Sequence, residues 1–297
     1  MSDEPTNIEW RLSEAREALV ERMWGKVPLV YNHAVLCQLG LPYRSQGNAE
    51  TFTRVSGNAS LRLRAGEVRE ADGSFRPALL PYGAVARLLL LNLCSESVKR
   101  QSPVVEVERS LTAFCRQLGL STDTRAMRRI KEQANRMSVL QMRIDVDSKT
   151  YRDTFQGMVF SKFRVETPVS YQQECLFPSI VEFSTDFYCS LAEHAVPLRL
   201  EAVRALSHSS RSLDIYFWLA SRLHRVSKPM DIRYTTLRWQ FGTPTQEMKS
   251  FKRSFRIALK SALMVYPEAR VEVIHGGIRL HNSPSPVPRR RAKGLLV

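Results

Sequence analysis

Basic side chains gather on one predicted helix near the C-terminal end of the chain. The segment 245–267, TQEMKSFKRSFRIALKSALMVYP, has the periodicity of an amphipathic helix. Its polar side carries the cations Lys249, Lys252, Arg253, Arg256 and Lys260. Between 246 and 260, only Glu247 opposes them. Lysine and arginine bind phosphate oxygens and also pair with guanine in the major groove, so this helix predicts a contact with double-stranded DNA.

Other side chains of this helix suit the same contact. Gln246 stands near the N-terminus, the end that usually contacts the bases, and a glutamine amide can pair with adenine. Ser250 and Ser254 are small enough to permit close approach. The opposite side predicts a core-facing stripe of Phe251, Phe255, Ala258, Leu259, Ala262 and Leu263.

A β-hairpin is predicted directly after this helix, in ARVEVIHGGIRL. Its tip is His275-Gly276-Gly277, because glycine permits the backbone angles of a tight turn. Arg279 is a candidate for contact with the DNA backbone or the minor groove. For His275, a plain turn residue is the favoured interpretation, and contact with DNA is the alternative.

A second basic helix is predicted over 122–137. The helix before it ends at Gly119, a natural C-cap, and Ser121 to Thr124 offer N-caps. Its cations are Arg125, Arg128, Arg129, Lys131 and Arg136. Two alternating segments follow, VLQMRIDVD and MVFSKFRVE, which we expect to pair across a polar turn.

The two basic helices stand in the same order of elements, in 81–166 and in 209–281. Each region predicts a buried helix, a short strand, a short helix, the basic helix and two strands, which is the winged-helix order. A further hairpin is predicted in 50–64 around Gly57-Asn58. We expect an α+β fold with two tandem winged-helix domains and an N-terminal helical arm. The expected parts are 1–48, an N-terminal helix and loop; 49–168, the first winged-helix domain; 169–283, the second; and 284–297, a basic disordered tail.

Composition supports a polyanionic partner. The 297 residues carry a formal net charge of +15, which indicates nucleic acid first and an anionic membrane surface second. A generally basic protein without such a partner is the plain alternative. The five cysteines are odd in number and form no C-x-x-C, so reduced structural thiols are expected. No signal peptide and no membrane span are predicted, and the expected location is the cytoplasm.

Sequence motifs for catalysis are missing. The chain has no phosphate-binding P-loop, no G-x-S-x-G, no H-E-x-x-H and no His-x-His pair. Asp145 and Asp147 alternate on a predicted strand and resemble a nuclease metal pair, but the solvent face of a strand is the favoured interpretation. We therefore expect no enzyme activity, no cofactor and no metal.

The ends and loops offer further hypotheses. Residues 8–24 predict an amphipathic helix that packs on its own domain or mediates self-association. Residues 26–48 are expected to be mostly loop. Within them, Gln38–Pro42 loosely resembles the peptide that docks on sliding clamps; Gln117–Ser121 does too, but is better explained as a helix end. The tail cations Arg289, Arg290, Arg291 and Lys293 could add phosphate attraction.

Several segments resemble plasmid replication initiators of the RepA type. These are LPYGAVARLLLLNL, RSLTAFCRQLGL, EHAVPLRLEAVRAL, SLDIYFWLASRLHRV and ALKSALMVYPEARVEV, and the resemblance runs from about 79 to 281. It implies binding to repeated origin sequences, help in melting adjacent A·T-rich DNA, and loading of host helicase with host initiator. It also implies an equilibrium between monomers that initiate and dimers that repress.

We therefore expect a replication initiator that binds double-stranded DNA at plasmid origin repeats. Its partners would be host initiator, helicase and possibly sliding clamp, together with a second copy of the chain, but no membrane. A winged-helix transcriptional regulator without a replication role is the first alternative, and an origin nickase is a disfavoured second. A role for residues 1–78 does not follow from the resemblance.

Overall fold

The computed structural model describes residues 12, 28–69, 72–107, 111–148, 150, 152–165, 178–243 and 245–287. The predicted N-terminal helix over 8–24 lies outside these residues except for Leu12, which is buried in the hydrophobic core. The tail cations from 288 onward also lie outside them. Within the described ranges, no helix is both long and apolar enough to cross a membrane.

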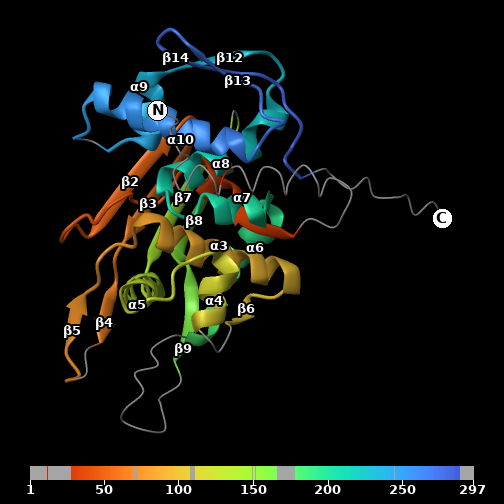
Figure 1. The fold of residues 1–297 in the computed structure, drawn as a ribbon. Coiled ribbons are helices and arrows are strands. Elements are labelled where there is room, and N and C mark those ends of the chain that lie inside the picture. Colours follow the sequence, from red (N-terminus) through yellow and green to blue (C-terminus); the bar gives the residue numbers. More distant parts are fainter. Residues whose placement is uncertain are drawn as a thin grey trace, which may run out of the picture.

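A four-stranded antiparallel sheet forms the middle of the molecule (Figure 1). Its order is β2 (Thr51–Ser56), β3 (Ala59–Arg64), β7 (Gln141–Asp147) and β8 (Arg152–Met158). The predicted hairpin over 50–64 is confirmed, and Gly57 takes the positive φ of 60° that its turn requires. Leu61, Leu63 and Met142 lie buried on one face, so period-2 alternation places the apolar side chains toward the core.

The predicted pairing of VLQMRIDVD with MVFSKFRVE is wrong. β7 pairs with β8, whose sequence RDTFQGM lacks apolar alternation because it is an exposed edge strand. The next segment forms β9 (Phe160–Val165), which belongs to another sheet of order β6 (Val104–Glu106), β10 (Pro178–Phe183), β9. Because β6 pairs with β10, it does not join the β7–β8 hairpin.

The expectation of a mostly irregular segment over 26–48 is also wrong in part. β1 (Leu29–His33) pairs with β11 (Ala195–Arg199), and α2 (Ala34–Gln38) packs against α8 (Ser210–Arg222). Pro28 directly precedes β1 and Pro197 lies within β11, and proline argues against a strand in the sequence. The two strands also lie far apart in the chain.

The buried helix α3 (Gly83–Arg100) packs against β1, α8 and two further helices. These are α5 (Thr124–Ser138) and α6 (Thr185–Glu193). α4 (Leu111–Leu118) precedes α5, and Gly119 between them has the positive φ of 67° expected of a C-cap. The short helix α7 (Leu200–Ala205) leads into α8, which continues as a 3₁₀ turn, Leu223–Arg225. β4 (Glu67–Arg69) and β5 (Phe75–Pro77) form a separate small hairpin.

The C-terminal elements follow the order predicted from the sequence. β12 (Met230–Arg233), α9 (Tyr234–Phe241) and α10 (Met248–Met264) precede the hairpin of β13 (Val271–Ile274) and β14 (Gly277–Leu280). β12 pairs with β14, which closes a three-stranded sheet of order β12–β14–β13. α10 packs on α8 and α9 in the upper part of the molecule (Figure 1).

Buried polar contacts fix the end of α9 against β2 and α2. Arg54 on β2 donates to the carbonyl oxygens of Gln240 at 2.8 Å and Gly242 at 3.4 Å. The Gln240 amide donates to the carbonyl oxygen of Gln38 at 2.8 Å. The two bonds from Arg54 satisfy backbone acceptors at the end of α9, and the bond from Gln240 satisfies one at the end of α2, so α9 is held against both elements.

Candidate nucleic-acid interface

The long helix α10 has the two faces that its sequence predicts. Phe251, Phe255, Ala258, Leu259 and Ala262 are buried, and Leu263 is half-buried. Lys249, Arg253, Arg256 and Lys260 are exposed at steps of four, three and four residues, which places them along one side of the helix. No acidic residue occurs within Met248–Met264. The result is a rigid helix, anchored by aromatic side chains, with a row of cations facing solvent.

Gln246 is bonded inside the protein rather than free for a base. Its side-chain oxygen accepts a hydrogen bond from Arg211 Nη2 at 3.2 Å, and its Nε2 donates to Ser254 Oγ at 3.2 Å. The Ser254 hydroxyl in turn donates to the carbonyl oxygen of Phe251 at 3.0 Å. Gln246 therefore ties the start of α10 to α8, while Ser250 remains exposed.

Tyr234 at the start of α9 positions two of the predicted cations. Arg256 Nε donates to the Tyr234 hydroxyl at 2.9 Å, and its guanidinium carbon lies 5.5 Å from the ring centre. Lys252 Nζ lies 5.4 Å from the same ring centre, and Lys252 is half-buried. Cations held on a ring face lose mobility, so Arg256 is preorganised and Lys252 projects less than Arg253.

The C-terminal hairpin carries His275 exposed at its tip. Arg279 faces Asp231 across the β12–β14 register, and its Nε and Nη2 donate to the carboxylate at 2.6 and 2.9 Å. The bond from Arg279 lowers the pKa of Asp231. Arg279 is half-buried and its charge is offset by Asp231, whereas His275 and the cation row of α10 are exposed. Arg279 is therefore less available to a polyanion than the α10 row.

The first basic helix, α5, keeps only part of its predicted face. Arg125, Arg128 and Arg129 are exposed, and Lys131 is half-buried. Arg136 is 9% exposed. Its Nη1 donates to the Leu80 carbonyl oxygen at 3.0 Å, its Nη2 pairs with Glu132, and its guanidinium lies over the ring of Tyr82. Arg136 thus fixes α5 to the chain before α3 and is not on the exposed face.

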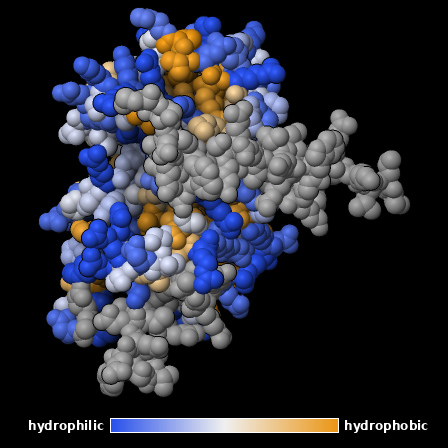
Figure 2. All heavy atoms as spheres, viewed as in Figure 1, coloured by the Kyte–Doolittle hydropathy of each residue, from blue (hydrophilic) through white to orange (hydrophobic). Residues whose placement is uncertain are grey.

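Two exposed apolar side chains near α10 were not predicted as site residues. Ile257 on α10 is 61% exposed, and Trp239 on α9 is 75% exposed. Ile257 comes two residues after the buried Phe255, which on a helix turns it away from the core stripe. That spacing was the available signal. Figure 2 shows an apolar patch at the top of the view, next to mostly hydrophilic residues.

The acidic pair on β7 is already occupied by protein donors. Asp145 accepts from Arg143 Nε at 2.9 Å, Thr154 Oγ1 at 2.7 Å and Ser60 Oγ at 3.2 Å. These bonds, that of Arg143 foremost, lower the pKa of Asp145 to about 2. Asp147 pairs with Arg152 at 2.5 Å. In the described part of the chain, no group of three or more potential ligands from His, Cys, Asp and Glu could hold a metal ion.

The clamp-like peptide Gln38–Pro42 lies in the interior. Leu39 and Leu41 belong to the hydrophobic core, and a Cβ added at Gly40 would meet Asp214 Oδ2 at 2.0 Å. A peptide buried in this way cannot reach a clamp while the chain is folded, so the docking interpretation of this segment is wrong. The interpretation of Gln117–Ser121 as a helix end is confirmed by the C-cap at Gly119.

Comparison with solved structures finds a related fold. A crystal structure of domains 2 and 3 of RctB, as selenomethionine derivatives, aligns with a TM-score of 0.52 at 13% identity. The alignment covers 76% of this chain and 81% of that one. A second crystal structure, of RctB domains 2–3, has a TM-score of 0.49 at 11% identity and covers 83% of this chain and 94% of that one.

Comparison with curated proteins finds no significant match. A family profile, by contrast, matches residues 80–240, more than half of the 297 residues. The matched range contains α3 to α8, β12 and nearly all of α9. That family is described as plasmid-encoded RepA protein, and the chain belongs to it.

Proposed function

We propose that this protein initiates plasmid replication by binding repeated double-stranded origin DNA through α10. The observation that carries the proposal is the row Lys249, Arg253, Arg256 and Lys260, exposed on a helix without acidic residues. DNA affinity rests largely on such cations, and a helix fits the major groove. The buried aromatic stripe holds the row rigid, so its spacing can match one face of the groove.

The order of elements around α10 supports the proposal that this part is a winged helix. α8, β12, α9 and α10 precede the β13–β14 hairpin, and β12 closes the sheet by pairing with β14. In this interpretation, α10 is the recognition helix and the hairpin with His275 is the wing. A helix–turn–helix places its second helix in the groove, while the first crosses the backbone.

α5 is the proposed second contact. Arg125, Arg128 and Arg129 face solvent in the lower half of the molecule, whereas α10 lies in the upper half (Figure 1). The winged-helix interpretation is weaker here, because β6 pairs with β10 and the β7–β8 hairpin joins β2 and β3. We include α5 because two separated basic helices on one chain can contact one long repeat.

The remaining parts of the proposal follow from the family. The resemblance to plasmid initiators of the RepA type implies that monomers initiate replication and that dimers repress their own gene. It also implies that host initiator and helicase are recruited. We propose the same roles for this chain, acting as a DNA-binding protein without catalysis.

The test measures binding of the full chain to labelled origin-repeat DNA across a salt series. Lys249→Ala with Arg253→Ala should lower affinity and flatten the slope of log K against log salt by about two units, one for each lost phosphate contact. The matched control is Lys99→Ala with Arg100→Ala, which removes the same charge at the C-terminal end of α3. Equal effects in both pairs would contradict the proposal.

A transcriptional regulator of the same fold would also bind a repeat, so binding alone does not separate the two. A plasmid that carries only this gene and its neighbouring repeats should replicate if the protein is an initiator. A nickase would convert supercoiled origin DNA to the nicked form with magnesium or manganese, and we expect no such conversion.

A further inference from the structure

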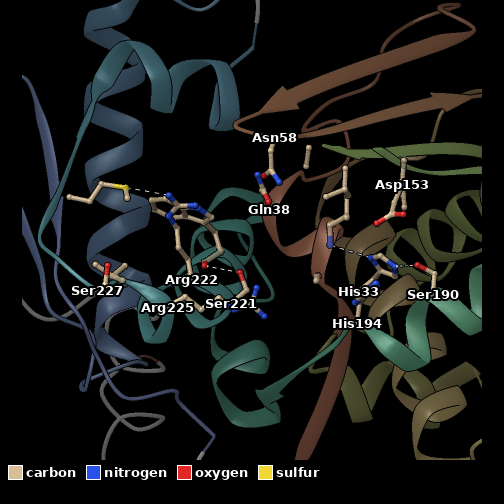
Figure 3. A pocket seen from close by; sticks show the side chains of 18 of the residues that line it. His33, Gln38, Asn58, Asp153, Ser190, His194, Ser221, Arg222, Arg225 and Ser227 are labelled. Carbon is tan, nitrogen blue, oxygen red and sulfur yellow. Dashed lines mark hydrogen bonds between the residues drawn. The ribbon is translucent and has the colours of Figure 1, made fainter. Parts of the chain in front are cut away.

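A cleft of about 890 Å³ lies away from the cations of α10. One wall comes from β1 and α2, the end of the central sheet and α6; the other comes from the end of α8, the 3₁₀ turn and β12. Figure 3 shows Ser221, Arg222, Arg225 and Ser227 on one side and His33, Ser190, His194 and Asp153 on the other. No residue of α10 lines this cleft. Its volume lies within the range of small-molecule sites.

Arg222 is half-buried in this cleft, and its buried Nε has no hydrogen-bond partner in the described part of the chain. Its Nη2 lies 3.3 Å from Met230 Sδ, and a thioether sulfur is only a weak acceptor. An unpaired buried donor is costly, and a charged one more so. A guanidinium in this state favours the arrival of an oxygen-rich anion.

The buried arginines of the described chain show what Arg222 is missing. Arg87 and Arg199 each pair with a carboxylate, at 2.7 and 2.5 Å. Arg54 donates to two backbone carbonyl oxygens, and Arg136 donates to a carbonyl oxygen and pairs with a carboxylate. Since this fold satisfies its structural arginines with oxygen acceptors, the acceptor for Arg222 is expected from a ligand.

The wall that carries Arg222 has further positive charge at its rim. Arg225 and Lys228 are exposed, and no described acidic side chain forms an ion pair with either of them. Of the two carboxylates that line the cleft, Asp231 is held by Arg279 at 2.6 Å. Asp153 stands on the opposite side. The Arg222 wall therefore presents three cations with one neutralised carboxylate.

The opposite wall supplies polar and apolar surface, with Asp153 as its carboxylate. His33 Nε2 lies 2.9 Å from Ser190 Oγ, and its Nδ1 accepts from the backbone N–H of Val35. Burial lowers the pKa of His33 to about 4, so the ring is neutral at physiological pH. Phe155 and Val146 add partly buried apolar surface. Such a wall suits a planar, uncharged group better than a second anion.

We propose that this cleft binds a phosphate-bearing ligand, with its phosphate on Arg222, Arg225 and Lys228 and its remaining part against the His33–Phe155 wall. Phosphate oxygens would supply the acceptors that Arg222 lacks, in the forked geometry that guanidinium groups prefer. A free nucleotide and the backbone of a nucleic-acid strand both offer this group. The proposal does not depend on origin binding by α10, because the two sites share no residue.

Isothermal titration of the full chain, with ATP, inorganic pyrophosphate and a short single-stranded oligothymidylate as probes, tests the proposal. At least one probe should bind, and Arg222→Gln should weaken that binding about tenfold or more, the value of a charged hydrogen-bonded contact. Binding of ATP alone identifies a free nucleotide, whereas binding of oligothymidylate identifies a nucleic-acid strand. Binding of pyrophosphate alone shows that the phosphate group suffices.

Two controls keep the result decisive. Lys228→Ala changes an exposed side chain, so it should leave the fold unchanged while weakening the bound probe. Lys249→Ala with Arg253→Ala should leave the titration unchanged, even if it abolishes binding to origin DNA. No binding by any probe, or equal binding by wild type, Arg222→Gln and Lys228→Ala, would overturn the proposal without affecting the proposed role of α10.

Discussion

Arg87 on α3 and Asp214 on α8 form a bidentate ion pair in the protein interior, with Nε–Oδ1 at 2.7 Å and Nη2–Oδ2 at 2.8 Å. Arg87 Nη1 also donates to the carbonyl oxygens of Pro42 and Gly83, at 3.1 and 2.9 Å. One guanidinium thus joins the chain after α2, the start of α3 and α8. Because α10 packs on α8, this pair helps to set where the basic helix stands relative to the central sheet.

Removing one partner of this pair should be more damaging than removing both. Asp214→Ala leaves the buried charge of Arg87 uncompensated and should lower the free energy of unfolding by about 3–5 kcal/mol. The double variant Arg87→Leu with Asp214→Leu removes both charges and should be less destabilised than Asp214→Ala. Urea denaturation measures both. A single variant that loses less stability than the double would contradict this account.

Burial of His33 predicts a loss of stability in mildly acidic solution. The pKa of His33 is lowered from 6.5 to about 4 by burial and by the nearby His194. The folded state therefore binds fewer protons than the unfolded state between these values. The contribution of neutral His33 to the free energy of unfolding is complete above pH 6.5. It is lost as the pH falls toward 4, by about 3 kcal/mol in total.

Denaturation at a series of pH values checks this prediction, with His33→Gln as the control. The variant keeps a polar group near Ser190 but cannot titrate, so its unfolding free energy should depend less on pH between 6.5 and 4. Asp145, with its pKa of about 2, contributes stability that is lost only at lower pH, and so does not confuse this window. Parallel pH profiles for wild type and His33→Gln would show that His33 is not the titrating group.

Local patterns predicted those parts of the fold that depend on neighbours in sequence. The Phe251–Phe255 stripe, the hairpin at Gly276 and the helix end at Gly119 all follow from spacing or from glycine geometry. The pairing of β1 with β11 could not be predicted in this way, because neither strand carries a signal that names a distant partner. The edge strand β8 is mostly exposed, so it buries few side chains and has no apolar alternation that the sequence could reveal.

Within the candidate site, too, the sequence could predict a pattern but not the contacts that each side chain makes. Charge and periodicity placed Lys249, Arg253 and Lys260 on the solvent side of α10. They could not separate a cation that faces solvent from one that is held inside. Unlike Arg128, Arg136 meets a carbonyl oxygen and an aromatic ring from the chain before α3, and it also pairs with Glu132 on its own helix.

Gln246 should act as a positioning residue for α10. If its bonds to Arg211 and Ser254 fix the start of the helix, Gln246→Ala should lower stability by about 1 kcal/mol for the lost hydrogen bonds. Affinity should fall by the same factor for the natural repeat and for every single-base variant of it. Competition binding with a set of such variants is the measurement. Relaxed preference at one base pair would instead show direct reading of that base by Gln246.

Ile257 should contribute to sequence preference through thymine. It is 61% exposed on α10 beside Arg253 and Arg256, and apolar side chains contact the thymine methyl group in the major groove. Ile257→Ala should weaken binding to the natural repeat by about 1 kcal/mol, at the low end for base discrimination. Replacing each thymine by deoxyuridine removes only the methyl group. The wild type should lose affinity at one such position, and Ile257→Ala should lose nothing further there, because the contact is already absent. Equal losses in both proteins at every position would mean that Ile257 faces the DNA without reading it.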